Sequence, residues 1–276
     1  MKRKHELWVI WVYVILTLYF FYTIYPIFLM ISTSLKQNKE IIQNPAGFPK
    51  DITFEGFIKL FEKENFGQFF LNSIFVTVVA GIILLIVSLL LAYALSRYVN
   101  KISRFLFFFF LAGMMVPLRL GLLSLNDLLY KLNLIDNLWG IIFIYVAMGI
   151  PFTMFILTGF IRMIPITLEE SAFIDGANTF TVLTRIIVPL IKPAIATVVI
   201  YNFVPMWNDV YFPLIFIKSV EKRMLMHAVT LFFGQFSTNW NLVFSALTVA
   251  CIPVIVLYIF CSKYLIRGLM AGSLKG

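Results

Sequence analysis

The sequence predicts an all-α integral membrane protein that crosses a bilayer with about six helices. Of its 276 residues, 61% are hydrophobic and 13% are charged, whereas soluble domains are roughly 45–50% apolar and about 25% charged. A single core would leave much of this apolar surface uncovered, so the excess is expected to face lipid. The apolar runs of the membrane domain, residues 1–276, lie near 7–31, 69–95, 105–118, 138–161, 193–217 and 242–261.

The first run follows Lys2, Arg3 and Lys4 and therefore resembles a secretory signal peptide. It is far longer than the roughly 7–15 apolar residues of such a signal, and no A-x-A cleavage pattern follows it. We expect it to remain as the first span. The third run is short and ends at Pro117, although apolar residues continue through 119–125.

Basic residues are dense in the short segments that lie on one side of the predicted membrane. With the N-terminus inside, the inner segments carry Lys2, Arg3, Lys4, Arg97, Lys101, Arg104, Arg162, Arg185, Lys192, Lys263, Arg267 and Lys275. The positive-inside rule then places both termini in the cytoplasm. The net charge of +9 is spread over the ends of the apolar runs, which is typical of membrane anchoring and argues against nucleic-acid binding.

Two outer segments are expected to be structured. Residues 33–68 alternate apolar and charged positions, with Pro45 and Pro49 as helix breakers. Residues 119–137 are apolar with sparse polar groups, which is typical of a short helix at the membrane interface. Within the second span, Ser88, Ala92 and Ser96 recur every fourth residue and predict one face that permits close helix packing.

The long inner segment between the fourth and fifth spans, residues 163–189, predicts a helix–turn–helix at the membrane surface. Pro165 ends the incoming helix, and Thr167 with Glu170 forms a T-x-x-E capping box that starts a new one. Gly176 provides the backbone freedom for a C-terminal turn. Asn178 or Thr179 can cap a second short helix, which runs to Pro189. The bland alternative is that Glu170 is only a cap and the segment only a connector.

The same segment resembles the EAA motif of ABC importer permeases. That motif has a Glu, two small residues, three further residues, a Gly, nine further residues and then Ile-x-Leu-Pro. Here it is Glu170-Ser171-Ala172, Gly176 and Ile186-x-Val188-Pro189. Ser replaces the first Ala and Val replaces Leu, and both changes are conservative in size.

The resemblance extends over nearly the whole chain. Asn72-Ser73, AYALSR at 92–97, IPITLEESAFIDGA at 164–177, WNDVYFPL at 207–214 and GLMAGSLKG at 268–276 are similar to the carbohydrate-uptake branch, and in particular to the shorter six-span permease of maltose-type transporters. The resemblance implies a type I permease fold. It also implies import of a mono-, di- or oligosaccharide by alternating access across a bacterial cytoplasmic membrane.

The resemblance further implies partners and contact sites. Residues 168–182 would be a coupling helix in a groove of a cytoplasmic ABC ATPase, with contacts from Glu169, Glu170, Ser171, Ala172, Asp175, Gly176 and Ala177. Gly268, Gly272 and Lys275 of the tail would reach toward the ATPase dimer. The partners would be two such ATPases, which bind ATP and Mg²⁺, a second homologous permease and an extracytoplasmic solute-binding protein. No cofactor is expected in this chain itself.

Polar residues near the outer end of the fifth span indicate a solute path. Asp209 lies there with Asn202, Trp207 and Asn208, and a charge inside a span is costly unless it has a function or a partner. Amides and a carboxylate beside aromatic rings suit sugar hydroxyls and ring faces. The alternative is that Asp209 caps a helix or pairs with a neighbour, and Asn72 at the mouth of the second span is open to both interpretations.

Other functions have less support. The chain lacks a G-x-x-x-x-G-K-[ST] phosphate loop and an H-E-x-x-H metal motif, and it shows no catalytic constellation and no metal-ligand spacing. We therefore expect no enzyme. An ion-coupled secondary transporter would show inverted repeats or several charges inside its spans. An ABC permease for a non-sugar solute remains as an alternative.

Overall fold

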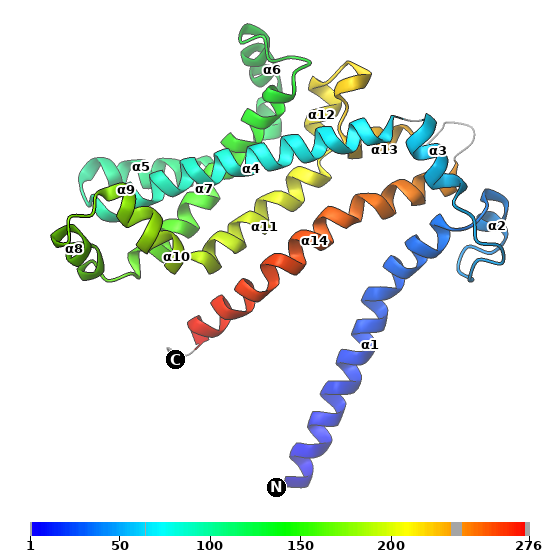
Figure 1. The fold of residues 1–276 in the computed structure, drawn as a ribbon, viewed down its shortest axis with the longest axis horizontal. Coiled ribbons are helices and arrows are strands. Elements are labelled where there is room, and N and C mark those ends of the chain that lie inside the picture. Colours follow the sequence, from blue (N-terminus) through cyan, green and yellow to red (C-terminus); the bar gives the residue numbers. More distant parts are fainter. Residues whose placement is uncertain (1, 64, 233–238, 274–276) are drawn as a thin grey trace. The chain divides into compact units, whose positions relative to one another are not determined.

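A computed structural model describes residues 2–63, 65–232 and 239–273, and the regular structure in this part of the chain is entirely helical (Figure 1). The chain divides into two compact units, residues 1–67 with 228–252 and residues 68–227 with 253–276. The predicted all-α class is confirmed.

Four helical segments among the described residues are long and apolar enough to cross a membrane: Trp8–Ser34, Phe66–Arg97, Leu138–Arg162 and Trp240–Lys263. A fifth candidate is a helix pair bent by 79°, Thr179–Leu190 with Lys192–Asn208. These segments correspond to five of the predicted apolar runs. The remaining run forms a helix of 13 residues, which is shorter than the roughly 20 residues needed to cross the hydrocarbon.

The first unit contains α1 (Lys2–Ser34), α2 (Asn38–Gln43), α3 (Glu55–Lys63) and the beginning of α14 (Trp240–Ser273). The side-chain amide of Asn241 donates to the backbone oxygens of Ser34 (3.0 Å) and Lys36 (2.7 Å). The Lys36 side chain is fully buried, and its ammonium donates to the Asn44 carbonyl at 3.0 Å. Backbone oxygens thus satisfy this buried charge, as burial requires.

The second unit is a helical bundle with α7 (Leu138–Arg162) near its centre. Helices α5 (Lys101–Gly113), α11 (Lys192–Asn208) and α12 (Tyr211–Phe216) pack against α7, while α4 (Phe66–Arg97) shares its two apolar core clusters (Figure 1). Ser88, Ala92 and Ser96 of α4 are all buried. The small-residue face predicted for the second span is therefore confirmed.

The short outer helix predicted within 119–137 is present as α6 (Leu122–Lys131), preceded by the 3₁₀ turn η1 (Leu118–Gly121). Helix α5 ends at Gly113 and not at Pro117, because residues 114–116 leave the helix through a turn.

The fifth run, predicted as one span over 193–217, is in fact two helices. Helix α11 ends at Asn208, Asp209 has an extended backbone with ψ of 129°, and α12 begins at Tyr211. The 3₁₀ turn η3 (Val220–Lys222) and helix α13 (Leu225–Leu231) follow.

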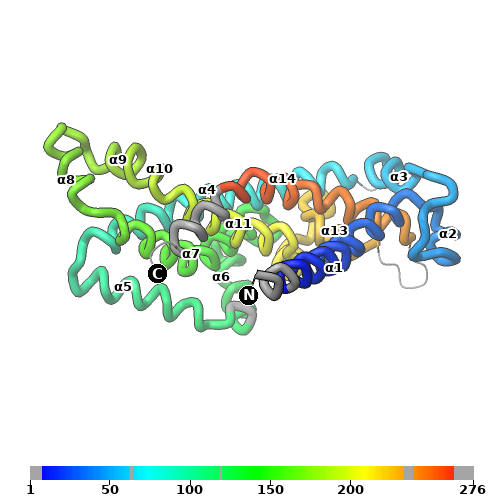
Figure 2. Tube along the Cα trace, turned by 90° about the horizontal axis from the view of Figure 1, so that it is seen from below, coloured from blue at the N-terminus to red at the C-terminus, as the bar shows by residue number. Residues whose placement is uncertain are grey.

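The segment between α7 and α11 lies at one end of the second unit in both views (Figures 1 and 2). It contains α8 (Thr167–Ile174), α9 (Thr179–Val182), the π-helical turn η2 (Leu183–Ile187) and α10 (Val188–Leu190). We call residues 167–190 the wedge. Helices α6 and α12 lie together, away from the wedge (Figure 1).

Candidate functional site

Helix α8 of the wedge begins without the predicted capping box. Thr167 is the first helical residue and not the cap, because Ile166 already has helical backbone angles and its carbonyl accepts from the Glu170 N–H (3.0 Å). The capping-box prediction is therefore wrong. The backbone turn at Pro165 and Ile166 supplies the acceptors that the Thr side chain was expected to provide.

The end of α8 matches the prediction. Gly176 has a φ of +82°, a left-handed conformation that glycine adopts without steric cost. The Ala177 N–H donates to the Ala172 carbonyl (2.9 Å), and the Gly176 N–H donates to the Phe173 carbonyl (3.1 Å). This pair of bonds is the Schellman motif that closes a helix C-terminus.

The second helix of the wedge is capped by Asn178, one of the two predicted residues. Its side-chain oxygen accepts from the Thr181 N–H at 2.8 Å, which satisfies one of the donors that a helix start leaves free. The helical path continues through η2 and α10 to Leu190. The chain then bends at Ile191 and enters α11.

Glu169 faces the interior of the bundle. Its exposed fraction is 2%, whereas its neighbours Leu168 and Glu170 are exposed. The Arg97 guanidinium at the end of α4 donates from Nε to Glu169 Oε1 at 2.6 Å and pairs with the same oxygen through Nη2. The Tyr93 hydroxyl donates to Glu169 Oε2 at 2.9 Å. Glu169 thus connects the wedge to α4.

Two arginines connect the ends of α4 and α7 reciprocally. Arg97 of α4 donates to the carbonyl of Ile164, just beyond α7, and Arg162 of α7 donates to the carbonyl of Leu95 in α4, each at 3.2 Å. The Arg162 guanidinium also lies over the ring of Phe107 in α5, 5.1 Å from its centroid. A cation over a ring face is an attractive contact, so three helices meet at this end.

The opposite face of the wedge is exposed and carries large apolar side chains among polar ones. Ile174 and Phe180 have exposed fractions of 86% and 71%. Glu170, Ser171, Asp175 and Gly176 are exposed on the same segment, while Glu169 is buried and Ala172 and Ala177 are half-buried. An apolar face rimmed by polar groups is typical of a protein-binding surface.

A cavity of about 320 Å³ lies between α7 and α11. Its lining includes Tyr145, Tyr201, Asn202 and Asp209. The Tyr145 hydroxyl donates to Asp209 Oδ2 (2.9 Å), and the Tyr201 ring is stacked on Phe152 with centroids 3.7 Å apart. The lining of this cavity thus combines carboxylate, amide and hydroxyl groups with the exposed aromatic ring of Tyr201.

Asp209 is also a helix cap. Its carboxylate accepts from the N–H groups of Tyr211 (3.0 Å) and Phe212 (3.3 Å) at the start of α12. Together with the Tyr145 hydroxyl, these N–H donors give Asp209 a structural role. The sequence allowed this role as the alternative to a solute contact. A carboxylate has about four acceptor positions, and the described donors occupy three of them.

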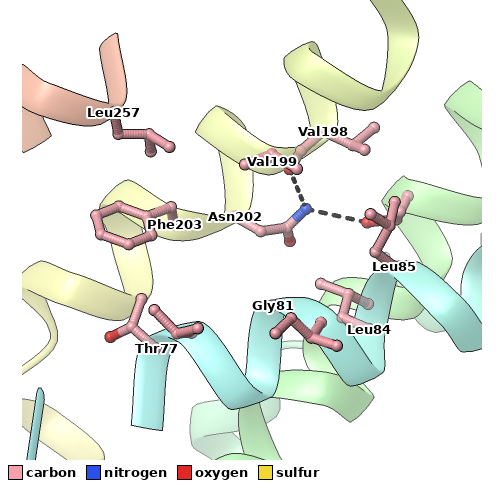
Figure 3. Close-up of a pocket in the computed structure, with 12 residues that line it drawn as sticks. Thr77, Gly81, Leu84, Leu85, Val198, Val199, Asn202, Phe203 and Leu257 are labelled. Atoms are coloured by element: carbon pink, nitrogen blue, oxygen red, sulfur yellow. Dashed lines mark hydrogen bonds between the residues drawn. The ribbon is translucent and has the colours of Figure 1, made fainter. Parts of the chain in front are cut away.

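Asn202 joins α11 to α7 beside a second, apolar cavity of about 230 Å³. Its side-chain nitrogen donates to Thr153 Oγ1 (3.0 Å) and to the Val198 carbonyl (2.7 Å) (Figure 3). Thr77 and Gly81 of α4 line the cavity opposite (Figure 3). Asn202 therefore contacts both cavities.

The other predicted solute-path residues lie elsewhere. Asn72 is buried and donates to the carbonyls of Glu221 (2.7 Å) and Arg223 (2.9 Å). Trp207 is buried, with its ring stacked on Phe203. Asn208 is exposed on α11. None of these three lines the cavity that contains Asp209.

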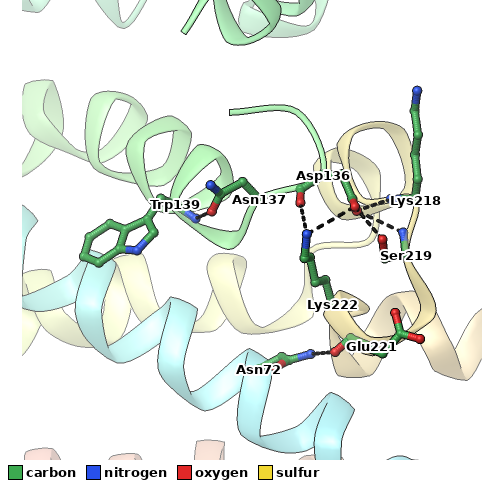
Figure 4. A network of polar contacts seen from close by, with 8 residues as sticks. All are labelled: Asn72, Asp136, Asn137, Trp139, Lys218, Ser219, Glu221 and Lys222. Carbon is green, nitrogen blue, oxygen red and sulfur yellow. Dashed lines mark hydrogen bonds and ion pairs between the residues drawn. The ribbon is translucent and has the colours of Figure 1, made fainter. Parts of the chain in front are cut away.

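A polar lock joins the segment before α7 to the segment after α12 (Figure 4). Asp136 accepts from the backbone N–H groups of Lys218 and Ser219 (both 2.9 Å), from the Ser219 hydroxyl and from the Lys222 ammonium (3.3 Å). The bond from the Ser219 hydroxyl, followed by the other donors, holds the pKa of Asp136 well below its usual range. The carboxylate is therefore ionised over the physiological range.

The predicted tail contacts lie outside the residues whose side chains the structure describes. Lys275 follows the last described residue, and Gly268 and Gly272 are within the final turns of α14.

Sequence reasoning missed the buried pair of Arg97 and Glu169 and the bond between Tyr145 and Asp209. A charged residue at the end of a span has an ordinary explanation as a membrane anchor, so Arg97 gave no sign of a partner. A buried tyrosine hydroxyl usually has a hydrogen-bond partner, but the predicted spans contain several tyrosines, so this rule alone would not have identified Tyr145.

Comparison with known proteins identifies the family. The model of the family "Binding-protein-dependent transport system inner membrane component" matches residues 85–270. The chain is 33% identical to the melibiose/raffinose/stachyose import permease MelC of Bacillus subtilis, with 91% of each chain covered. It is 30% identical to the diacetylchitobiose uptake permease DasC of Streptomyces coelicolor, with 97% of each covered.

A solved structure has the same fold. A chain of a bacterial ABC transporter that imports the acidic polysaccharide alginate superposes with a TM-score of 0.81 at 23% identity, covering 95% of this chain and 98% of that one. The family match and the relatives at 30% identity or more cover most of the sequence. This chain therefore belongs to the family of inner membrane components of binding-protein-dependent transport systems.

Proposed function

We propose that this chain is a permease subunit of an ATP-binding-cassette importer that carries a sugar into the cytoplasm. The observation that supports this most directly is the wedge. It presents Ile174 and Phe180 outward and is fixed to the bundle on its other side through Glu169. A surface helix that is exposed on one face and anchored on the other is suited to be bound and moved by a partner protein.

The proposed partner at the wedge is a cytoplasmic ATPase that binds ATP and Mg²⁺. Two such subunits, a second homologous permease and an extracytoplasmic solute-binding protein complete the transporter. The wedge and both termini lie on the cytoplasmic side in this arrangement, in agreement with the density of basic residues in the inner segments.

A sugar is the proposed solute for two reasons. The relatives named above import melibiose, raffinose, stachyose and diacetylchitobiose, all of them saccharides. The cavity of Asp209 also offers the chemistry that a sugar needs, because a carboxylate and the Asn202 amide can bond hydroxyls while the Tyr201 ring covers an apolar sugar face. This cavity carries a carboxylate and no Lys or Arg in its lining, which favours neutral over acidic saccharides.

Transport would proceed by alternating access. Binding of ATP closes the ATPase dimer, and this closure moves the wedge, so that the helices change between an outward-open and an inward-open packing. ATP can shift the equilibrium between the two packings only by the difference in its affinity for them. The energy enters at the wedge, and the solute crosses the bundle along helices such as α7 and α11.

Uptake by the purified transporter tests the proposal. The complex is isolated from its native cell through a tag on this chain and placed in liposomes that contain ATP. Labelled neutral oligosaccharides, uronate oligosaccharides, amino acids and phosphate are offered together with the co-purified binding protein. We expect ATP-dependent uptake of a neutral saccharide, and uptake of amino acids or phosphate alone would refute the proposed substrate class.

A further inference from the structure

Glu169 is an unusual residue for its position. It lies on a helix of eight residues whose other side chains are exposed or half-buried, yet its own exposed fraction is 2%. An apolar side chain would fill this position at lower cost, because two charges lose their hydration when they are buried together. The ion pair between Glu169 and Arg97 is therefore a poor explanation of stability. Its geometry tells more about its role.

The geometry of the pair formed by Glu169 and Arg97 specifies one position of α8 along α4. Apolar contacts are non-directional, whereas the planar guanidinium of Arg97 donates in fixed directions. It contacts Glu169 through Nε and Nη2 and the Ile164 carbonyl through Nη2. The Tyr93 hydroxyl, one turn earlier in α4, binds the second oxygen of Glu169. A shift of α8 along α4 would break all of these bonds together.

Helix α4 leads from this contact to the apolar cavity. Arg97 is its last residue, and Gly81 and Thr77 line the apolar cavity that also contains Asn202 (Figure 3). Sixteen residues separate Arg97 from Gly81, which corresponds to about 24 Å along a helix axis. A displacement of the Arg97 end of a continuous helix is thus carried to the apolar cavity, where Asn202 also lines the neighbouring cavity that contains Asp209.

We propose that Glu169, Arg97 and Tyr93 form a rigid joint that fixes α8 to α4, so that the two helices move as one body when the ATPase partner moves the wedge. These three are positioning residues and touch neither nucleotide nor solute. The inference rests on the proposed function, in which an ATPase binds the wedge. It assigns the transmission of movement to the buried Glu169, whereas the exposed neighbour Glu170 meets the partner.

A distance measurement tests the joint directly. Spin labels are attached at two exposed positions, Thr167 of α8, which lies outside the segment assigned to the ATPase, and Leu90 of α4. The transporter is complete, and its Cys251 and Cys261 are replaced by Ala. The wild-type joint should give one narrow distance distribution that is the same without nucleotide and with ATP bound. In Glu169→Gln, the distribution should broaden or shift between the two states.

The transport stoichiometry gives a second, independent result. Glu169→Gln and Arg97→Lys should assemble with their partners and still hydrolyse ATP, while the solute moved per ATP hydrolysed falls about tenfold, within the usual range of coupling between sites. Lysine keeps the charge of Arg97 but lacks the fork that reaches two acceptors. The matched control is Lys101→Gln, an exposed cation four residues beyond Arg97, which should leave the ratio unchanged.

Each outcome is decisive. A distance that changes between states in the wild type, or that stays equally narrow and constant in Glu169→Gln, overturns the joint even if the protein transports sugar. An unchanged stoichiometry in assembled Arg97→Lys also overturns it. By contrast, a wild-type transporter that shows no ATP-dependent uptake refutes the proposed function, and the distance measurement still decides whether the joint is rigid.

Discussion

Glu169 and Glu170 are neighbours in α8 but face different sides of the helix. Glu169 is buried against Arg97 of α4, and Glu170 is exposed on the outer face of the wedge. Successive residues of an α-helix are separated by about 100° around its axis, so one carboxylate can hold the bundle while the next meets another protein. The two substitutions should therefore fail in different ways.

Glu170→Lys is expected to abolish uptake while the chain remains inserted in the membrane at its normal level. The exposed side chain makes no contact that the bundle needs, but the reversed charge would disturb the surface offered to the ATPase. Uptake assays with immunoblots of the membrane fraction measure both quantities. Glu170→Gln, which keeps the size of the side chain, serves as the milder comparison. Full uptake by Glu170→Lys would mean that this face is not the coupling surface.

Gly176 should tolerate asparagine better than valine. Its φ of +82° costs an ordinary L-residue about 1–2 kcal/mol, and a β-branched residue is the least suited to it. A Cβ at this position meets nothing within 4 Å, so the backbone is the whole cause of the penalty. Gly176→Val should uncouple ATP hydrolysis from uptake, and Gly176→Asn should retain most of the coupling. Equal loss in both variants would point to crowding instead.

The sequence was sufficient for the all-helical class and for the turn and cap of the wedge, because apolar runs, Gly176 and Asn178 act locally. It did not predict the break of the fifth run at Asp209. It was insufficient where a residue's role depends on a distant partner. Arg97 and Glu169 are 72 positions apart, and Tyr145 and Asp209 are 64 apart, so no local pattern relates them. The T-x-x-E pattern at Thr167 failed for the opposite reason, since the preceding backbone had already started the helix.

Gly149 is expected to be intolerant of alanine, in contrast to Gly159 in the same helix. A Cβ on Gly149 would overlap the side chain of Leu84 and approach Asn202 Oδ1 to 2.8 Å, whereas a Cβ on Gly159 meets nothing within 4 Å. Overpacking of this kind costs about 1–3 kcal/mol. Thermal unfolding of the purified protein should show Gly149→Ala as less stable and Gly159→Ala as equal to or more stable than the wild type. The reverse order would mean that α4 and α11 are packed differently around Gly149.

The contact between Asn202 and Thr153 should contribute modestly to stability. Hydrogen bonds between membrane helices are worth about 0.6 kcal/mol on average and up to about 2 kcal/mol. A double-mutant cycle with Asn202→Leu and Thr153→Val isolates the bond. We expect a coupling energy in that range, measured by denaturant unfolding in detergent. A coupling energy of zero would contradict the bond between α7 and α11.

The lock at Asp136 predicts a defined pH dependence. Because its folded pKa lies below the unfolded value of about 4, its contribution to stability is complete above that value and is lost as the pH falls further toward the folded pKa. The difference in unfolding temperature between wild type and Asp136→Asn should thus be constant above about pH 5 and should shrink below pH 4. A difference that grows on acidification would show that the carboxylate is not held ionised by Ser219 and Lys222.

The outer face of the wedge offers the most direct measurement. A photo-crosslinking amino acid at Ile174, whose exposed fraction is 86%, is activated in the native cell, and the captured protein is identified by mass spectrometry. We predict a cytoplasmic subunit with a phosphate-binding G-x-x-x-x-G-K-[ST] loop. Capture of an extracytoplasmic protein, or labelling of Ile174→Cys by an impermeant reagent added outside intact cells, would contradict the account.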